Sequence, residues 1–480
     1  MTLDRPDLDR WQFRLAPLHK PVTLRTQLEI GPDLRCAEVQ NHRGQVVGWL
    51  LGFGIDLSAR ALIGDRWQLG PDCPSDPDGM AWHVLHGLGG RFLFVLDHSG
   101  ARRIYTDSSA QVPCVFDSEK QIAGSTADAI LNAQEYEDRF DRVLYDQLGV
   151  AGEGWFPGGP TAHHGLNRVL PGYYLDLDSW TTSRFWPRSA PVETQDTGAT
   201  LGVLIANIQS QIEALLAGPQ KIALALTGGR ETRMMLACAH PWIAQIDCVT
   251  ITGRDRHQTD TVLAKKITKE LGLSHRELPR VNADPTQHEQ FLHRGGHCNG
   301  DSNALYHPSV WPIADSHVFL GGLGGEVARA FLWRKNDTPD MAVTPDLLMR
   351  RFGLAKSPEI EAAIARWLAE LPAMSALDIL DLAYIDLRCG CWYGVQFCSD
   401  PTLVRHAPLF NYAAVEQMLS LPASMKRDQS MAHAVIERLW PELLRYPYNS
   451  LGKVGDTKLK LQRALSDPRL VLKKLRKIRR

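Results

Sequence analysis

The chain has 480 residues, of which 44% are hydrophobic and 22% charged, a composition typical of a globular protein long enough for two domains. Basic and acidic residues nearly balance, and the net charge of −1 excludes any argument from bulk charge for binding nucleic acid or a membrane. Nine scattered cysteines, a polar start without a secretory pattern and no apolar run of membrane-spanning length predict a cytoplasmic protein.

Short apolar segments with alternating polarity dominate the first 190 residues and predict β-strands. The clearest hairpins are expected over 38–51 and over 92–97 with 103–106. The other elements predicted in this part are strands over 112–116, 121–123 and 173–177 and helices over 127–134 and 138–148.

After a polar, irregular stretch over 187–197, where a domain boundary is predicted, strands alternate with helices. This alternation predicts a parallel, doubly wound sheet. The predicted strands are 222–226, 246–252, 276–278 and 318–320, the predicted helices are 202–216, 232–239 and 259–271, and the chain is expected to be mostly helical after Pro345.

A glycine-containing loop, T-G-G-R-E-T over 227–232, joins the first of these strands to a helix. Glycines let backbone N–H groups approach an anion, and the helix N-terminus adds partial positive charge. Carboxylates such as Glu231 bind Mg²⁺ together with phosphate oxygens, so the loop can hold pyrophosphate and magnesium. A purely structural strand-to-helix turn is the alternative for this loop taken alone.

A second glycine loop, G-G-L-G-G over 321–325, follows the strand 318–320 and also ends in an acid, Glu326. Parallel sheets bind ligands at the carboxyl ends of their strands. The two loops are therefore predicted to meet there and to place Glu231 and Glu326 on one magnesium ion.

The loops together resemble the asparagine synthetase and β-lactam synthetase superfamily, which includes lasso-peptide cyclases. There the loops read S-G-G-x-D-S and S-G-x-G-S-D, where this chain has T-G-G-R-E-T and G-G-L-G-G-E. Residues 165–172 carry the pattern G-x-x-R-x-x-P-G, which resembles the end of that family's N-terminal domain. The resemblance extends over nearly the whole chain.

This resemblance implies a mixed α/β and α+β fold. It predicts an Ntn-hydrolase-like αββα domain over 1–190 and an ATP-pyrophosphatase (adenine nucleotide α-hydrolase-like) domain over 198–470, with a parallel sheet and a helical C-terminal part. The basic tail 471–480 is interpreted as a solvated helix end or as a contact for an anionic partner. The cofactors implied are ATP and Mg²⁺, the latter on Glu231 and Glu326, and the implied nucleotide contacts are Leu226, Thr227, Gly228, Gly229, Glu231, Thr232, Arg233, Ile251, Gly321 and Gly322.

Several positions depart from the family pattern. Thr2 stands where glutamine-hydrolysing members have the cysteine nucleophile, so no glutaminase activity is expected. Leu323 replaces a Glu or Tyr that assists catalysis in relatives, and the acids considered in its place are Asp378, Asp381 and Asp386, with ordinary surface or capping roles as the alternative.

The lysine that the family uses in catalysis is also displaced. His433 and Lys453 are the candidates to replace it, and Arg230 is predicted to contact phosphate beside the first loop. Three close thiols, Cys389, Cys391 and Cys398, are interpreted as buried structural cysteines rather than a zinc site.

The function predicted from these features is ATP-dependent, AMP-forming amide-bond synthesis through an acyl-adenylate, without glutamine hydrolysis. The product is expected to be a lactam, a macrolactam or an ordinary amide of natural-product biosynthesis. The substrate is a small molecule or a peptide, with a precursor peptide or a carrier protein as further partners, and no oligomeric state is predicted. The alternatives are a catalytically inactive binding or scaffold subunit, and an adenylating enzyme with a thiol or carrier acceptor.

Overall fold

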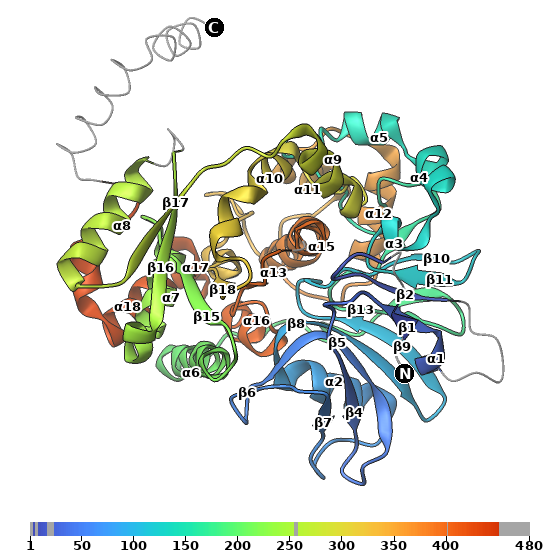
Figure 1. The fold of residues 1–480 in the computed structure, drawn as a ribbon, viewed down its shortest axis with the longest axis horizontal. Coiled ribbons are helices and arrows are strands. Elements are labelled where there is room, and N and C mark those ends of the chain that lie inside the picture. The colour runs from blue at the N-terminus through green and yellow to red at the C-terminus, as the bar shows by residue number, and fades with distance from the viewer. Residues whose placement is uncertain (1–2, 5–7, 17–23, 254–257, 401, 451–480) are drawn as a thin grey trace, which may run out of the picture.

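Two mostly antiparallel sheets form the N-terminal part of the protein (Figure 1). The structure is a computed structural model, and it describes residues 3–4, 8–16, 24–253, 258–400 and 402–450. One sheet has the order β1-β3-β2-β11-β10-β12 and the other β14-β13-β9-β8-β5-β4-β7, with β6 paired to β5. Their bounds are β1 Leu3–Asp4, β2 Phe13–Leu15, β3 Leu28–Ile30, β4 Cys36–Gln40, β5 Val46–Asp56, β6 Ala61–Leu62, β7 Arg66–Gln68, β8 Leu88–His98, β9 Ala101–Thr106, β10 Val115–Asp117, β11 Ile122–Gly124, β12 Asn167–Arg168, β13 Tyr173–Asp176 and β14 Thr181–Arg184.

The two predicted hairpins are confirmed as β4 with β5 and β8 with β9, each pair antiparallel. The sequence interpretation missed helix α2 (Pro77–Gly87), although Asp76 caps it by accepting a hydrogen bond from the Gly79 N–H at 2.8 Å. The two predicted helices after β11 are three short ones: α3 (Ala127–Ile130), α4 (Ala133–Arg139) and α5 (Arg142–Gln147).

A parallel sheet forms the second part, as predicted, but with five strands rather than the four predicted, in the order β17-β16-β15-β18-β19. From β15, the strands β16 and β17 follow outward on one side and β18 and β19 on the other, so the order reverses between β15 and β18. Such a reversal creates a crevice at the carboxyl ends of the two strands. The bounds are β15 Lys221–Ala225, β16 Ile246–Thr252, β17 His275–Pro279, β18 His317–Leu320 and β19 Arg405–His406.

Helix α6 (Thr197–Leu216) leads into this sheet and begins five residues earlier than predicted. The Asp196 side chain caps it by accepting from the Ala199 N–H at 2.9 Å. Its length and composition would suffice to cross a membrane, contrary to the sequence expectation, but 56% of that apolar stretch is buried inside the protein. In Figure 1 it lies beside β15, as a core helix would.

Helices make up most of the remaining chain, and the prediction of a helical region after Pro345 is confirmed. The described α-helices not yet given are α1 Leu24–Gln27, α7 Arg230–Cys238, α8 Gln258–Leu271, α9 Pro285–Arg294, α10 Asp301–Tyr306, α11 Pro345–Phe352, α12 Pro358–Ala369, α13 Ala376–Ala383, α14 Gly390–Trp392, α15 Val395–Ser399, α16 Tyr412–Leu419, α17 Ala423–Asp428 and α18 Met431–Leu439. A short 3₁₀ helix, η4 (Gly325–Arg329), follows β18.

One continuous hydrophobic core includes residues from both parts of the chain. Tyr412, at the start of α16, is fully buried and lies edge-on to the rings of Phe185 and Trp186. Its hydroxyl accepts a hydrogen bond from the Gly172 N–H at 3.1 Å and reaches the Thr106 carbonyl at 3.4 Å. Helix α16 is thereby attached to the N-terminal sheet.

We expect Tyr412→Phe to lower the free energy of unfolding by about 1–3 kcal/mol, because the buried Gly172 N–H loses its acceptor. Urea unfolding followed by circular dichroism measures this change. The matched control is Tyr174→Phe, which removes the hydroxyl of a half-buried tyrosine and is expected to change stability by less than about 0.5 kcal/mol. Equal effects of the two substitutions would contradict the role given to the Tyr412 hydroxyl.

Candidate site at the carboxyl ends of β15 and β18

The two glycine loops predicted from the sequence lie at the reversal point of the parallel sheet. β15 and β18 are directly paired, with Leu224 opposite Leu320, so the segments that follow them leave the sheet side by side. The first loop leads into α7 and the second into η4. The structure therefore brings together the two segments that the resemblance singled out.

The first loop is held by its own side chains. The Thr227 and Thr232 hydroxyls lie 3.0 Å apart, and the Gly229 N–H donates to Thr227 Oγ1 at 3.0 Å. The Gly228 N–H donates to the Asp260 carboxylate at 2.8 Å. A phosphate group that binds these amides must replace the protein's own acceptors, and at Gly228 that acceptor is an anionic carboxylate.

The second loop lies directly against the first. A Cβ atom added to Gly322 would come within 2.8 Å of the Glu231 carbonyl carbon and 3.0 Å of the Thr232 nitrogen. A Cβ on Gly325 would come within 2.7 Å of Glu231 Cγ. Backbone atoms cannot yield as flexible side chains do, so Gly322 is required here for packing one loop on the other.

The two predicted metal ligands, Glu231 and Glu326, are brought together through a third residue. Arg329, the last residue of η4, places Nε 3.1 Å from Glu231 Oε1 in an ion pair. Its Nη2 donates a hydrogen bond to Glu326 Oε1 at 3.1 Å. Sequence reasoning missed Arg329, although its spacing of three residues from Glu326 is the helical spacing for an ion pair.

Glu326 is the more enclosed of these two acids. Its Oε2 accepts from the Gly324 N–H at 3.1 Å. Burial raises the pKa of the Glu326 carboxyl, Arg329 opposes that rise, and the nearby Glu231 charge adds to it. The charge of Glu326 therefore depends on the guanidinium beside it.

These acids do not fit the predicted magnesium ion as they stand. Each carboxylate already uses an oxygen on Arg329, and Mg²⁺ requires free oxygen ligands in near-octahedral geometry. Within the described part of the chain, no group of three or more His, Cys, Asp or Glu side chains is placed to hold a metal ion.

Arg233, predicted to contact phosphate, is fully buried and has other partners. It donates to the carbonyls of Gly228 at 2.6 Å and Pro447 at 2.8 Å. Burial lowers the pKa of its guanidinium to about 10, so it stays charged at neutral pH. Arg233 thus joins the loop to the segment 446–449 rather than pointing a free guanidinium at a ligand.

That segment covers the first loop and was not predicted as part of the site. The Asn449 N–H donates to the Gly228 carbonyl at 2.9 Å. The Tyr448 ring lies 4.3 Å from the Arg233 guanidinium and 5.1 Å from that of Arg230. Among the described residues, the buried Tyr448 hydroxyl has no hydrogen-bond partner. No sequence motif signals this role; only the proximity of 446–449 to Lys453 in the chain points to it.

The remaining predicted catalytic residues are Arg230, which belongs to the first loop, His433 and Lys453. Arg230 lies at the start of α7 and donates to the Gln429 side chain at 2.5 Å. His433 is on the exposed side of α18, and Lys453 lies outside the described residues. Ile251, predicted to contact the nucleotide, is half-buried near the carboxyl end of β16.

The acids considered as replacements for the family's catalytic acid have structural partners. Asp381 pairs with Lys426 at 2.8 Å inside the protein, and burial raises the Asp381 pKa to about 6. Asp386 accepts from the Trp367 indole at 2.8 Å, and its pKa is also raised to about 6 by burial. Asp378 accepts the Ser375 hydroxyl at 2.7 Å at the start of α13. The three cysteines near this region, Cys389, Cys391 and Cys398, are free and buried, in line with the structural interpretation.

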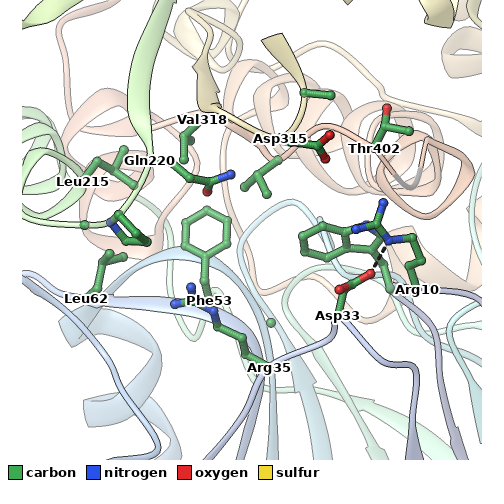
Figure 2. A pocket seen from close by; sticks show the side chains of 16 residues that line it. Arg10, Asp33, Arg35, Phe53, Leu62, Leu215, Gln220, Asp315, Val318 and Thr402 are labelled. Carbon is green, nitrogen blue, oxygen red and sulfur yellow. Dashed lines mark hydrogen bonds and ion pairs between the residues drawn. The ribbon is translucent and has the colours of Figure 1, made fainter. Parts of the chain in front are cut away.

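A cavity of about 310 Å³ lies at the opposite ends of the parallel strands (Figure 2). From the N-terminal part of the chain, Phe53 of β5 and Arg35 line the cavity. From the second part, Gln220, Asp315 and Val318 line it where β15 and β18 begin. It was not predicted from the sequence. Because it lies at the amino ends of the strands, it is separate from the glycine loops.

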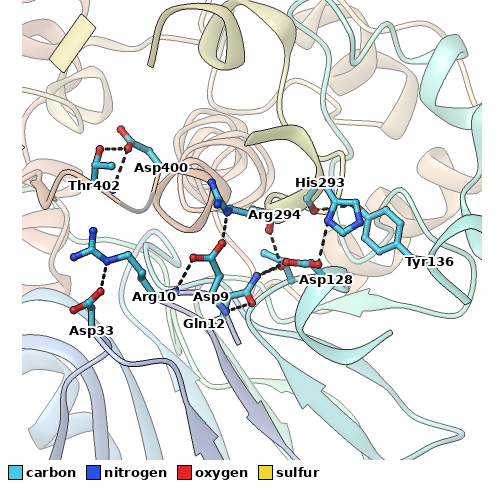
Figure 3. Close-up of polar contacts among 11 residues, drawn as sticks. Asp9, Arg10, Gln12, Asp33, Asp128, Tyr136, His293, Arg294, Asp400 and Thr402 are labelled. Carbon is cyan, nitrogen blue, oxygen red and sulfur yellow. Dashed lines mark hydrogen bonds and ion pairs between the residues drawn. The ribbon is translucent and has the colours of Figure 1, made fainter. Parts of the chain in front are cut away.

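Next to this cavity, charged residues attach α9 to the N-terminal part (Figure 3). Asp9 pairs with Arg294, and Asp128 lies 3.1 Å from His293 Nδ1. The Tyr136 hydroxyl donates to the His293 carbonyl at 2.8 Å. These contacts fix the junction between the two parts of the chain and do not involve the glycine loops.

Comparisons with known proteins assign no family. No protein-family description matches the chain, and no curated protein sequence matches it. Among solved structures, it is similar to the U34-tRNA thiolase NcsA from Methanococcus maripaludis with its 4Fe-4S cluster, at 13% sequence identity and a TM-score of 0.22. That similarity covers 55% of this chain and 80% of the thiolase, and at this TM-score it carries no argument about function.

We expect Gly322→Ala to destabilise the protein by about 1–3 kcal/mol, because the added Cβ meets backbone of the first loop. The matched control is Gly64→Ala, where a Cβ would meet no atom within 4 Å, and its effect should stay below about 1 kcal/mol. Chemical unfolding of both variants checks this. A neutral Gly322→Ala would show that the two loops are not in direct contact.

Proposed function

We propose that the carboxyl ends of β15 and β18 bind an adenine nucleotide and that the chain is an ATP-dependent carbon–nitrogen ligase that forms AMP and pyrophosphate. The observation that carries the proposal is the meeting of two glycine loops, each followed by a glutamate, at the reversal point of the sheet. Doubly wound sheets bind ligands at this point. In the same proposal, 198–470 is an ATP-pyrophosphatase-type domain and 1–190 an Ntn-hydrolase-like one.

The chemistry proposed is transfer through an acyl-adenylate. A substrate carboxylate attacks the α-phosphorus of ATP, and the bond to the departing pyrophosphate breaks. An amine then attacks the acyl carbon, loses a proton and expels AMP, which leaves an amide. The start of α7 and the Arg230 guanidinium supply partial and full positive charge for the departing pyrophosphate. His433 and Lys453 remain the other catalytic candidates.

The amine is proposed to come from the substrate itself or from a second substrate. The position matched to the family's thiol nucleophile is Thr2, so the proposal includes no release of ammonia from glutamine. Attack within one molecule gives a lactam or macrolactam, and attack between molecules gives an ordinary amide. A small molecule, a precursor peptide or a carrier-bound acyl group are the substrates considered.

A second candidate is a non-catalytic nucleotide-binding or scaffold subunit. The observation that favours it is that polar groups of the loops already have partners within the protein. Asp260 accepts a hydrogen bond from the Gly228 N–H, and Arg329 forms ion pairs with both glutamates. Release of AMP and pyrophosphate from ATP with a panel of carboxylates and amines separates the two functions, because only the ligase produces them.

Isothermal titration with ATP tests the nucleotide proposal itself. We expect a Kd between about 1 µM and 1 mM, the usual range for enzyme substrates. The titration is made once with excess Mg²⁺ and once with EDTA, so that the result does not depend on a metal. No heat of binding under either condition would refute the nucleotide site.

Asp260→Ala should raise the affinity of the loop for pyrophosphate by about 5- to 10-fold. The substitution frees the Gly228 N–H and removes one negative charge, worth about 1 kcal/mol or slightly more at this range. The matched control, Asp247→Ala, removes the same charge at the amino end of β16 and should leave the affinity unchanged. Weaker binding by Asp260→Ala would place the anion elsewhere.

A further inference from the structure

Arg329 occupies the central position between the two glutamates of the glycine loops. One guanidinium reaches Glu231, at the start of α7, and Glu326, within its own 3₁₀ helix, at 3.1 Å each. The side chains of the two acids are only 17% and 15% exposed. This arrangement joins the two loops across the point where the sheet order reverses.

The loops leave little freedom for this group. The Gly324 N–H donates to the second oxygen of Glu326, which fixes the carboxylate that Arg329 contacts. Gly325 lies against Glu231 Cγ, so the other acid is held by packing. Both acceptors are therefore placed before any ligand arrives, as is expected for a built cation site.

The charged groups that the described contacts place at the loops balance without a metal ion. Arg230, Arg233 and Arg329 supply three positive charges, and Glu231, Glu326 and Asp260 supply three negative ones. A divalent ion between the same carboxylates would have to share their oxygens with a guanidinium, and like charges at contact distance repel each other by several kcal/mol when partly buried.

We propose that Arg329 is the resident cation of this site and replaces the divalent metal, so that anionic phosphate groups at the glycine loops meet a guanidinium rather than Mg²⁺. The part of this inference that concerns phosphate rests on the proposed nucleotide site. The part that concerns the metal rests only on the contacts of Arg329 with Glu231 and Glu326.

Binding of Mn²⁺, measured by electron paramagnetic resonance as the loss of the free-ion signal, tests the metal part without any nucleotide. The wild-type protein is expected to bind Mn²⁺ no more tightly than Glu326→Gln. Arg329→Gln leaves two unpaired carboxylates and is expected to bind Mn²⁺ at least about tenfold more tightly, and adding Glu326→Gln should abolish that gain.

Arg334→Gln is the matched control, since it removes an exposed arginine charge five residues further along the chain. It should leave Mn²⁺ binding at the wild-type level. If Arg329→Gln does not fold, Arg329→Lys retains the charge and should still exclude Mn²⁺. Wild-type binding that Glu326→Gln weakens tenfold or more would overturn the inference, because the carboxylates would then already hold a metal ion. Mn²⁺ binding by Arg329→Lys that Glu326→Gln abolishes would also overturn it.

Nucleotide titrations then test the phosphate part separately. We expect the wild-type Kd for ATP to change less than about twofold between EDTA and excess Mg²⁺, and Arg329→Gln to weaken binding in EDTA by at least about tenfold. A wild-type affinity that falls tenfold in EDTA would overturn the inference. Absence of ATP binding in all proteins would refute the nucleotide proposal and this phosphate part, while the Mn²⁺ result would still decide the metal part.

Discussion

Direct contact between the backbone of Gly322 and the first turn of α7 is the constraint on which the rest of the site depends. It brings η4 against α7, and so brings Arg329 and Glu326 to Glu231 across two elements about 95 residues apart. A side chain at Gly322 would separate the loops by the width of at least one methyl group. The ion pairs, which act only at short range, would be lost with that contact.

The same loops show how glycine serves two different purposes. In the sequence, Gly228, Gly229 and Gly322 all read as sites where backbone approaches an anion. In the structure, the first loop fills the space that a Gly322 side chain would occupy, and the Gly228 N–H donates a hydrogen bond to the Asp260 carboxylate. A buried backbone N–H without an acceptor lowers the stability of the folded protein. The protein itself therefore supplies an acceptor, unless a ligand provides a stronger one.

The N-terminal sheets also shape the site, although they contribute no residue to the loops. Through Tyr412 and the shared core they hold α16, and Leu409, three residues before that helix begins, lies against Gly324. The ion pair of Asp9 with Arg294 also attaches α9 to the N-terminal part of the chain. The N-terminal sheets are thereby linked to the second glycine loop through α16 and the residues just before it.

Sequence reasoning predicted much of the fold because its signals are local. The strand predicted over 246–252 is β16 with the same bounds, and the glycine loops lie at strand ends as expected. The predicted starts of the helices were less exact, because α6 begins directly after its N-cap residue Asp196 and α7 directly after its N-cap residue Gly229. Strand β19 escaped prediction because two residues, Arg405 and His406, form a strand only through pairing with β18.

The sequence by itself determined that two glycine loops, each followed by an acid, end two strands of a parallel sheet. Only the tertiary structure decided what stands between those acids. Arg329 is visible in the sequence as a partner at helical spacing from Glu326, but its contact with Glu231 depends on β15 and β18 being neighbours. The physical reason is that strand order, unlike strand position, arises from long-range pairing that no local pattern encodes.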